Sequence, residues 1–90
     1  MSESNWGFAG GDASSTNNGG AIGSGANSEH GGAVGSGAKS NDGFAGGLNA
    51  KANGKNAIAL GVKANASGEG SVQIGEGDNS EKDTLKFKEH

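Results

Sequence analysis

Few side chains in this 90-residue sequence could perform catalysis. The two histidines are His30 and His90, and the chain has no cysteine. Neither histidine has a serine or cysteine partner in the nucleophile–base arrangement that covalent catalysis requires. We therefore expect that the chain is not an enzyme, that it has no catalytic residue and that it binds no cofactor.

Acidic residues near the C-terminus are the group best suited to attract a metal ion. Glu76, Asp78, Glu81 and Asp83 lie close together in the sequence, and carboxylate oxygens are the ligands that Ca²⁺ prefers. Calcium-binding β-rolls, however, repeat a unit rich in glycine and aspartate about every nine residues, and these acids follow no such period. We expect an acidic rim and no metal site, with a bound cation as the alternative.

The charge and hydropathy of the chain exclude several classes of partner. Ten acidic residues outweigh seven lysines, which gives a net charge of −3, whereas a nucleic-acid-binding surface needs a basic stripe. No stretch approaches the ~20 apolar residues of a membrane-spanning helix, and the sequence contains no signal-peptide core. We expect no nucleic-acid partner and no membrane insertion by this segment.

Glycine marks a short repeat along the chain, which contains 20 glycines and no proline. A short strand pattern closed by a glycine occurs six times, with the closing glycines at positions 11, 23, 35, 47, 61 and 75. The steps between them are 12, 12, 12, 14 and 14 residues. A fixed short period is typical of a solenoid. We therefore predict an all-β solenoid of about six repeats rather than the disordered linker that such a composition alone favours.

The first strand of each repeat carries large apolar residues at alternate positions. Residues two apart share one face of a strand, so we predict that this face forms the core. In the first four repeats one member of each pair is large and the other is glycine, as in Phe44 and Gly46. A thin, close-packed core requires such compensation of volume. The predicted core residues are Phe8, Ile22, Val34, Phe44, Ile58, Leu60, Val72 and Ile74.

The opposite face of the same strand carries alanine in five repeats and glutamine in the sixth. A solvated face would carry long polar side chains, whereas small residues let another backbone approach closely. We predict that this face is the interface between subunits, with the general composition of the chain as the alternative explanation. The predicted interface residues are Ala9, Ala21, Ala33, Ala45, Ala59 and Gln73.

A second short strand follows each closing glycine and carries alanine or serine on one face, as at Ala38 and Ser40. Polar turns such as Asn41-Asp42 should join the repeats, because asparagine, aspartate and glycine accept the backbone conformations that corners need. The last two repeats have longer corners, so the coil should widen there. The exposed side of this strand and its turns supplies a candidate ligand face, made of His30, Lys39, Lys51 and Lys55.

The two ends of the chain depart from the repeat. We expect residues 1–6 to cap the N-terminal end, with Trp6 over the first coil, and residues 7–84 to form the repeat domain. Residues 85–90 should form a capping strand or the start of a neck, because Leu85 and Phe87 alternate with polar residues. Terminal repeats of a solenoid must differ from internal ones to keep its ends soluble.

The last two repeats resemble a known family. Asn56-Ala57-Ile58-Ala59-Leu60-Gly61, followed by Ala64 and Ala66, and then Ser71-Val72-Gln73-Ile74-Gly75, are similar to the head repeats of YadA-type trimeric autotransporter adhesins. The end of the chain, from Ile74 to Phe87, is similar to repeat endings in phage tail-fibre proteins with YadA-like heads. The resemblance covers most of the chain. It implies a left-handed parallel β-roll, three chains packed side by side as a homotrimer, and adhesion to a surface component.

These observations predict a non-enzymatic module of a trimeric surface fibre. It would be an adhesin head on a bacterial cell-surface or outer-membrane fibre, or a receptor-binding segment of a phage virion tail. The expected partners are two further copies of the chain and a host-surface glycan or extracellular-matrix protein. The alternative is a purely structural trimerisation or spacer segment that binds no ligand of its own.

Overall fold

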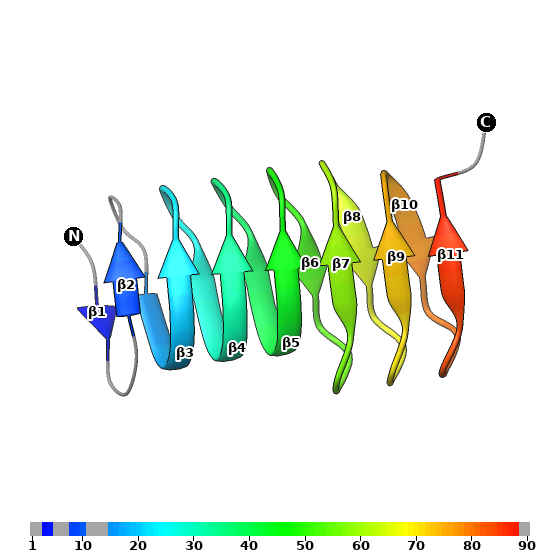
Figure 1. The fold of residues 1–90 in the computed structure, drawn as a ribbon, viewed down its shortest axis with the longest axis horizontal. Helices are drawn as coiled ribbons and strands as arrows, with labels where there is room; N and C mark the ends of the chain where they lie inside the picture. The colour runs from blue at the N-terminus through cyan, green and yellow to red at the C-terminus, as the bar shows by residue number, and fades with distance from the viewer. Residues whose placement is uncertain (1–2, 5–7, 11–14, 89–90) are drawn as a thin grey trace.

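The chain is a parallel β-solenoid of about five turns, and the residues that the structure describes include no helix. The computed structural model describes residues 3–4, 8–10 and 15–88. Trp6 and His90 lie outside the described residues, and the side chains of Phe8 and Ala9 are not described either. The coils stack along one axis, with the described strands running from β1 at one end to β11 at the other (Figure 1).

Every strand pairs with its neighbours in parallel. One wall of the coil contains β2, the second halves of β3 to β5, and then β7, β9 and β11; the other contains β1, the first halves of β3 to β5, and then β6, β8 and β10. The strands are β1 Glu3–Ser4, β2 Phe8–Gly10, β3 Ser15–Ile22, β4 Asn27–Val34, β5 Lys39–Gly46, β6 Lys51–Ala52, β7 Ile58–Leu60, β8 Ala64–Ala66, β9 Val72–Ile74, β10 Gly77–Asn79 and β11 Leu85–Phe87.

The register of the strands confirms the predicted period and adds one step to it. In the first wall each residue pairs with the one 12 positions later as far as Phe44, which pairs with Ile58, 14 positions later. Ile58 pairs with Val72, again 14 positions later. Val72 then pairs with Leu85, a step of 13 residues. β11 therefore continues the ladder of the first wall as its last rung.

The corners differ between the short and the long coils. In the 12-residue coils, β3, β4 and β5 each run for eight residues and bend from one wall into the other. Asn41-Asp42, predicted as a polar turn, therefore lies at a bend within a strand and not in a separate turn. In the longer coils a true turn at residues 54–56, and again at 68–70, separates the walls, as predicted.

One glycine column fills the tight corner of the short coils. A Cβ atom on Gly43 would overlap the carbonyl oxygen of Ala57 in the next rung, and Gly31 has the same relation to Gly43. In the longer coils this position holds Ala57 and Ser71, which fit there fully buried. The two extra residues of the longer corner thus make room for a side chain.

The closing glycines are needed for a different reason, which is their backbone conformation. Gly23, Gly35, Gly47 and Gly61 have φ between 119° and 129°, a region that residues with a Cβ atom rarely adopt. Each one turns the chain sharply from the first wall into the second, which explains why glycine recurs there at the repeat period.

A pair of glycine variants separates crowding from backbone strain. Gly43→Ala should destabilise the fold by about 3 kcal/mol, because the added methyl group meets backbone atoms that cannot move away. Gly25→Ala should cost only ~1 kcal/mol, because its φ is 75° but no heavy atom lies nearer than 4.0 Å to the new Cβ. Denaturant unfolding at one chain concentration measures both. Equal losses would contradict the tight-corner explanation.

Candidate interaction surfaces

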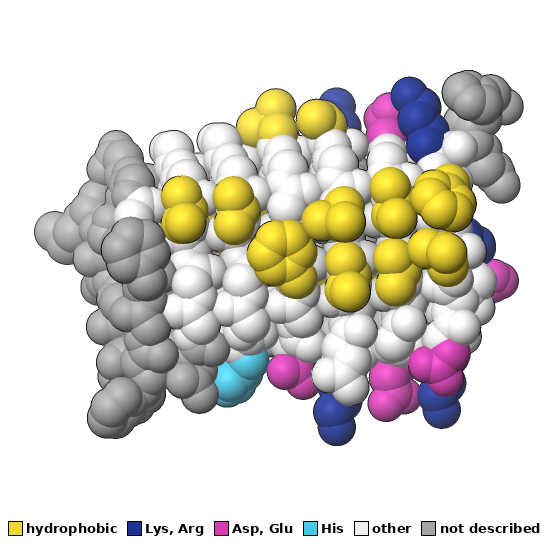
Figure 2. All heavy atoms as spheres, in the orientation of Figure 1, with side chains coloured by type: hydrophobic (Ala, Val, Ile, Leu, Met, Phe, Trp, Pro, Cys, Tyr) yellow, Lys and Arg dark blue, Asp and Glu magenta, His cyan; other side chains and the backbone are white. Residues whose placement is uncertain are grey.

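A continuous band of large apolar side chains covers the outside of the first wall (Figure 2). We call it the apolar strip. Its best exposed members are Phe87, at 61% exposed, Leu85, at 55%, and Ile22, at 49%. Monomeric soluble proteins rarely expose a contiguous apolar surface of this kind unless it binds a partner. The apolar strip consists of Ile22, Val34, Phe44, Ile58, Leu60, Val72, Ile74, Leu85 and Phe87.

The prediction that these side chains form the core of the coil was wrong. Phe44 and Ile58 are each 38% exposed and Leu60 is 37% exposed, and Val72 and Ile74 are half-buried. Their strands alternate as predicted, but the face that carries the large residues points away from the coil.

The predicted subunit interface is instead the interior of the coil. Ala21, Ala33, Ala45 and Ala59 are fully buried within the single chain, and Gln73 is 2% exposed. A side chain with no exposed surface cannot contact a second chain, so this prediction was wrong as well. The prediction for the second strand was right, since Ala26, Ala38, Ala50, Ala64, Ala52, Ala66, Ser28 and Ser40 also point inward and are buried.

The thickness of the coil explains why the face with small residues lies inside and the face with large residues lies outside. The chain measures 37 × 22 × 11 Å, so the coil is thin across its two walls. The described side chains buried between the walls belong to alanine and serine, apart from Gln73 and Asn79 near the C-terminal end. Leucine, isoleucine and phenylalanine must therefore point outward.

Two glycines on the same face as the apolar strip leave room for its largest side chain, the ring of Phe44. A Cβ atom on Gly32 would lie 2.9 Å from Cδ1 of Phe44, and one on Gly46 would lie 3.0 Å from Cε2 of the same ring. Phe44 thus spreads over a glycine of the preceding rung and a glycine of its own rung. The volume compensation that the sequence shows is real, but it smooths the outer strip instead of filling a core.

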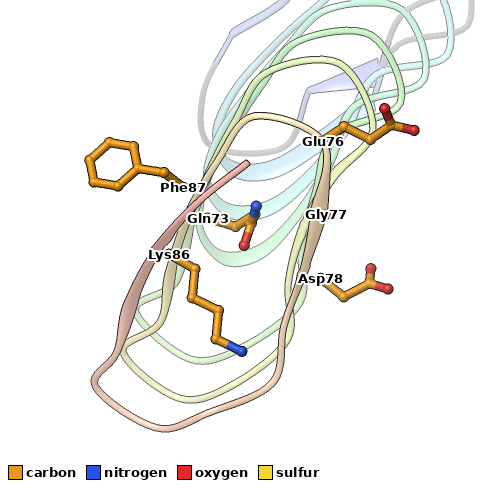
Figure 3. A pocket seen from close by; sticks show the side chains of 6 residues that line it. All are labelled: Gln73, Glu76, Gly77, Asp78, Lys86 and Phe87. Carbon is orange, nitrogen blue, oxygen red and sulfur yellow. The ribbon is translucent and has the colours of Figure 1, made fainter. Parts of the chain in front are cut away.

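At the C-terminal end of the coil, two neighbouring residues of β11 show which face of the strand points inward and which points outward. Lys86 and Phe87 are neighbours on β11, and Figure 3 shows Lys86 on the inner side with Gln73, while Phe87 points away outside. Lys86 pairs with Glu81 at 3.4 Å. Glu76 and Asp78 point away from the coil interior (Figure 3), so these two acids do not converge with the lysine.

Asn79 closes the last coil from within. Its Nδ2 donates hydrogen bonds to the carbonyl oxygens of Val72, at 3.0 Å, and Thr84, at 2.7 Å, and its Oδ1 accepts one from the backbone N–H of Glu81. The spacing of the earlier repeats predicts that Asn79 faces water and that Asp78 and Ser80 point inward, and this prediction was wrong. The 13-residue last step moves it inward, and no glycine marks that step in the sequence.

The four residues of the candidate ligand face do not share one surface. Lys39 and Lys51 are cross-strand neighbours on the second wall. His30 lies at the bent corner, between Asn18 and Asp42 of the adjacent rungs. Lys55 belongs to the turn at residues 54–56, next to the rung that carries Glu69. All four are exposed.

The part of the chain that the structure describes has neither a metal site nor a membrane-spanning helix. No group of three or more histidine, aspartate or glutamate side chains there could hold a metal ion. Within the same residues, no helix is long and apolar enough to cross a membrane.

Comparison with known proteins places this fold. Residues 52–75 match the YadA head domain repeat in two copies. The solved collagen-binding domain of the Yersinia adhesin YadA matches with a TM-score of 0.65 and 25% sequence identity, over 83% of this chain and 54% of that one. This is a YadA-like head fold. It is a non-enzymatic adhesin fold, as the resemblance in the last two repeats predicted.

The extent of the likeness is limited in two ways. The chain spans about half the length of the solved YadA domain that it matches. A search of curated protein sequences found no significant match.

Two neighbouring residues test the assignment of the YadA-like faces. Ala33→Leu should destabilise the chain by about 3 kcal/mol, because Ala33 is fully buried between Ala21 and Ala45 of the adjacent rungs and overpacking is costly there. Val34→Leu, on the apolar strip, should change the stability by less than ~1 kcal/mol. Denaturant unfolding of both variants at equal concentration measures this. The reverse order would contradict the assignment.

Proposed function

We propose that this chain is a homotrimeric segment of a surface fibre, a non-enzymatic adhesin-type head that attaches to a matrix or host surface. The observation that carries the proposal is the apolar strip, which the single chain leaves uncovered along its length. A chain this thin buries only small side chains, so most of its large apolar surface is available for association. Covering that surface is the main favourable term of assembly.

The geometry of the strip favours other copies of the same chain as its cover. The strip runs along the solenoid axis and repeats at every rung of the first wall. Parallel copies placed around a shared axis would bring rung against rung, and closed rotational symmetry is the usual arrangement of identical subunits. The number three and the left-handed winding follow from the likeness to trimeric adhesin heads.

The attachment partner follows from the same likeness. The solved YadA domain is described as collagen-binding, so a collagen-type matrix protein is the first ligand to test for this chain. Three copies of one weak contact would act together, and such multivalency raises the overall affinity well above that of a single contact. The second wall and the corners remain exposed for this contact when the first wall is covered.

A substitution in the centre of the strip tests the proposal. Chemical cross-linking should yield a trimer of the wild-type chain and none of Ile58→Asp, because the carboxylate would lose its hydration between the chains. Attachment to a collagen-coated surface should fall at least about tenfold with the loss of multivalency. Val62→Asp, at an exposed apolar residue in a turn outside the strip, serves as the matched control and should retain both properties.

The outcomes separate the alternatives. Unchanged cross-linking of Ile58→Asp would contradict assembly through the strip. An intact wild-type trimer that attaches neither to collagen nor to host cells would favour a purely structural spacer.

A further inference from the structure

We propose that a pair of lysines on the outer side of the second wall, Lys39 and Lys51, binds an acidic polysaccharide. The proposal rests on the proposed function, since it names one partner class of the attachment surface. Lys39 on β5 and Lys51 on β6 are directly paired in the parallel ladder, and both are exposed. Paired strands lie ~4.8 Å apart, so two ammonium groups can approach one sulfate or carboxylate group together.

Within the described residues, no ion pair with an acidic side chain offsets the repulsion between these two lysines. Like charges directly opposite each other on neighbouring strands are destabilising. Among the residues that the structure describes, neither Lys39 nor Lys51 forms an ion pair, whereas Lys82 pairs with Glu69 at 3.8 Å and Lys86 with Glu81 at 3.4 Å. The chain thus places acids beside lysines elsewhere but leaves this pair open to an anion from outside.

A hollow next to the lysine pair extends the cationic surface. It has a volume of about 300 Å³, and its lining includes Lys63 as well as Lys51. Asp78 lies at the same hollow, but it forms no ion pair with either lysine in the described structure. Asn49 and Asn65 complete the lining. Their amides can donate hydrogen bonds to sugar hydroxyl groups and accept bonds from them.

A second hollow, of about 140 Å³, lies on the other side of the pair, at Lys39. Its lining is polar and contains one acid, Glu29. The charge of this wall therefore changes along the axis, with the lysines at the centre and one carboxylate toward each end. The lysines form a local site, since the net charge of the whole chain is −3.

The composition of this face selects a polysaccharide over other polyanions. The residues that line the two hollows are lysine, asparagine, serine, aspartate and glutamate, without an apolar side chain. An acidic peptide would find no apolar pocket to anchor its side chains. Single-stranded nucleic acid would find no aromatic platform on which to stack its bases. A linear chain of charged sugars needs only repeated cations and hydrogen-bonding amides.

The test uses heparin, a sulfated polysaccharide, and two double variants of the full chain. Lys39→Gln combined with Lys51→Gln should weaken binding to immobilised heparin at low salt about tenfold or more, because a trimer loses the pair in all three copies. Lys55→Gln combined with Lys82→Gln removes the same charge from a corner that also holds Glu69, and should change the affinity less than about twofold. Light scattering of each sample reports whether the trimer is intact.

Each outcome decides the proposal. Equal losses in the two double variants would show attraction by overall charge and overturn it, as would tight binding of poly-glutamate through the same lysines. An intact trimer that does not bind heparin would overturn the lysine site and leave the proposed function standing. A monomer whose heparin affinity still depends on Lys39 and Lys51 alone would overturn the trimer and support the site.

Discussion

The narrow space between the two walls of the coil is the constraint on which the other features depend. Nearly all the residues between the walls are alanine, serine or glycine, such as the fully buried Ala33 and Ala59, and Gln73 and Asn79 are the larger exceptions. Interiors of proteins are close-packed, and an added methylene group is felt in them. Each rung therefore gains little apolar burial of its own. Stability must come from the parallel backbone ladder and from whatever covers the outside of the first wall.

That constraint divides the residues of each repeat between two separate tasks. Small residues fill the inside of the coil, and large ones such as Ile58 and Phe44 form the apolar strip that we propose as the subunit interface. The second wall is left free for polar residues, so one short repeat supplies a scaffold, an apolar outer face and a polar outer face. The capping of the interior at Asn79 and Lys86 fits this division, because polar groups replace alanine where the stack ends.

Much of the fold could be predicted from the sequence, because the closing glycines and the alternating apolar residues carry the period directly. The assignment of the faces could not. Alternation shows that Ala59 and Ile58 lie on opposite sides of a strand, but it does not show which side is inside the coil. The rule that large residues are buried fails for this single thin coil, in which the large apolar side chains lie on the outside. The inward position of Asn79 was hidden because the turn after Gly75 is one residue shorter than the turn after Gly61, so that Gly77 pairs with Ala64 and Asn79 with Ala66. Lys39 and Lys51 could be selected from the sequence as candidate ligand residues. Lys63 could not, because only the structure shows that it lines the same hollow as Lys51.

The native mass of the chain, measured by light scattering during size exclusion over a tenfold range of concentration, tests the central claim most directly. Because the proposed trimer would cover the apolar strip with other copies of the chain, we expect one species of about 26 kDa, three times the 8.7 kDa chain. A folded, compact species of 8.7 kDa that persists across the range would contradict it, since the strip would then be stable in water without a partner.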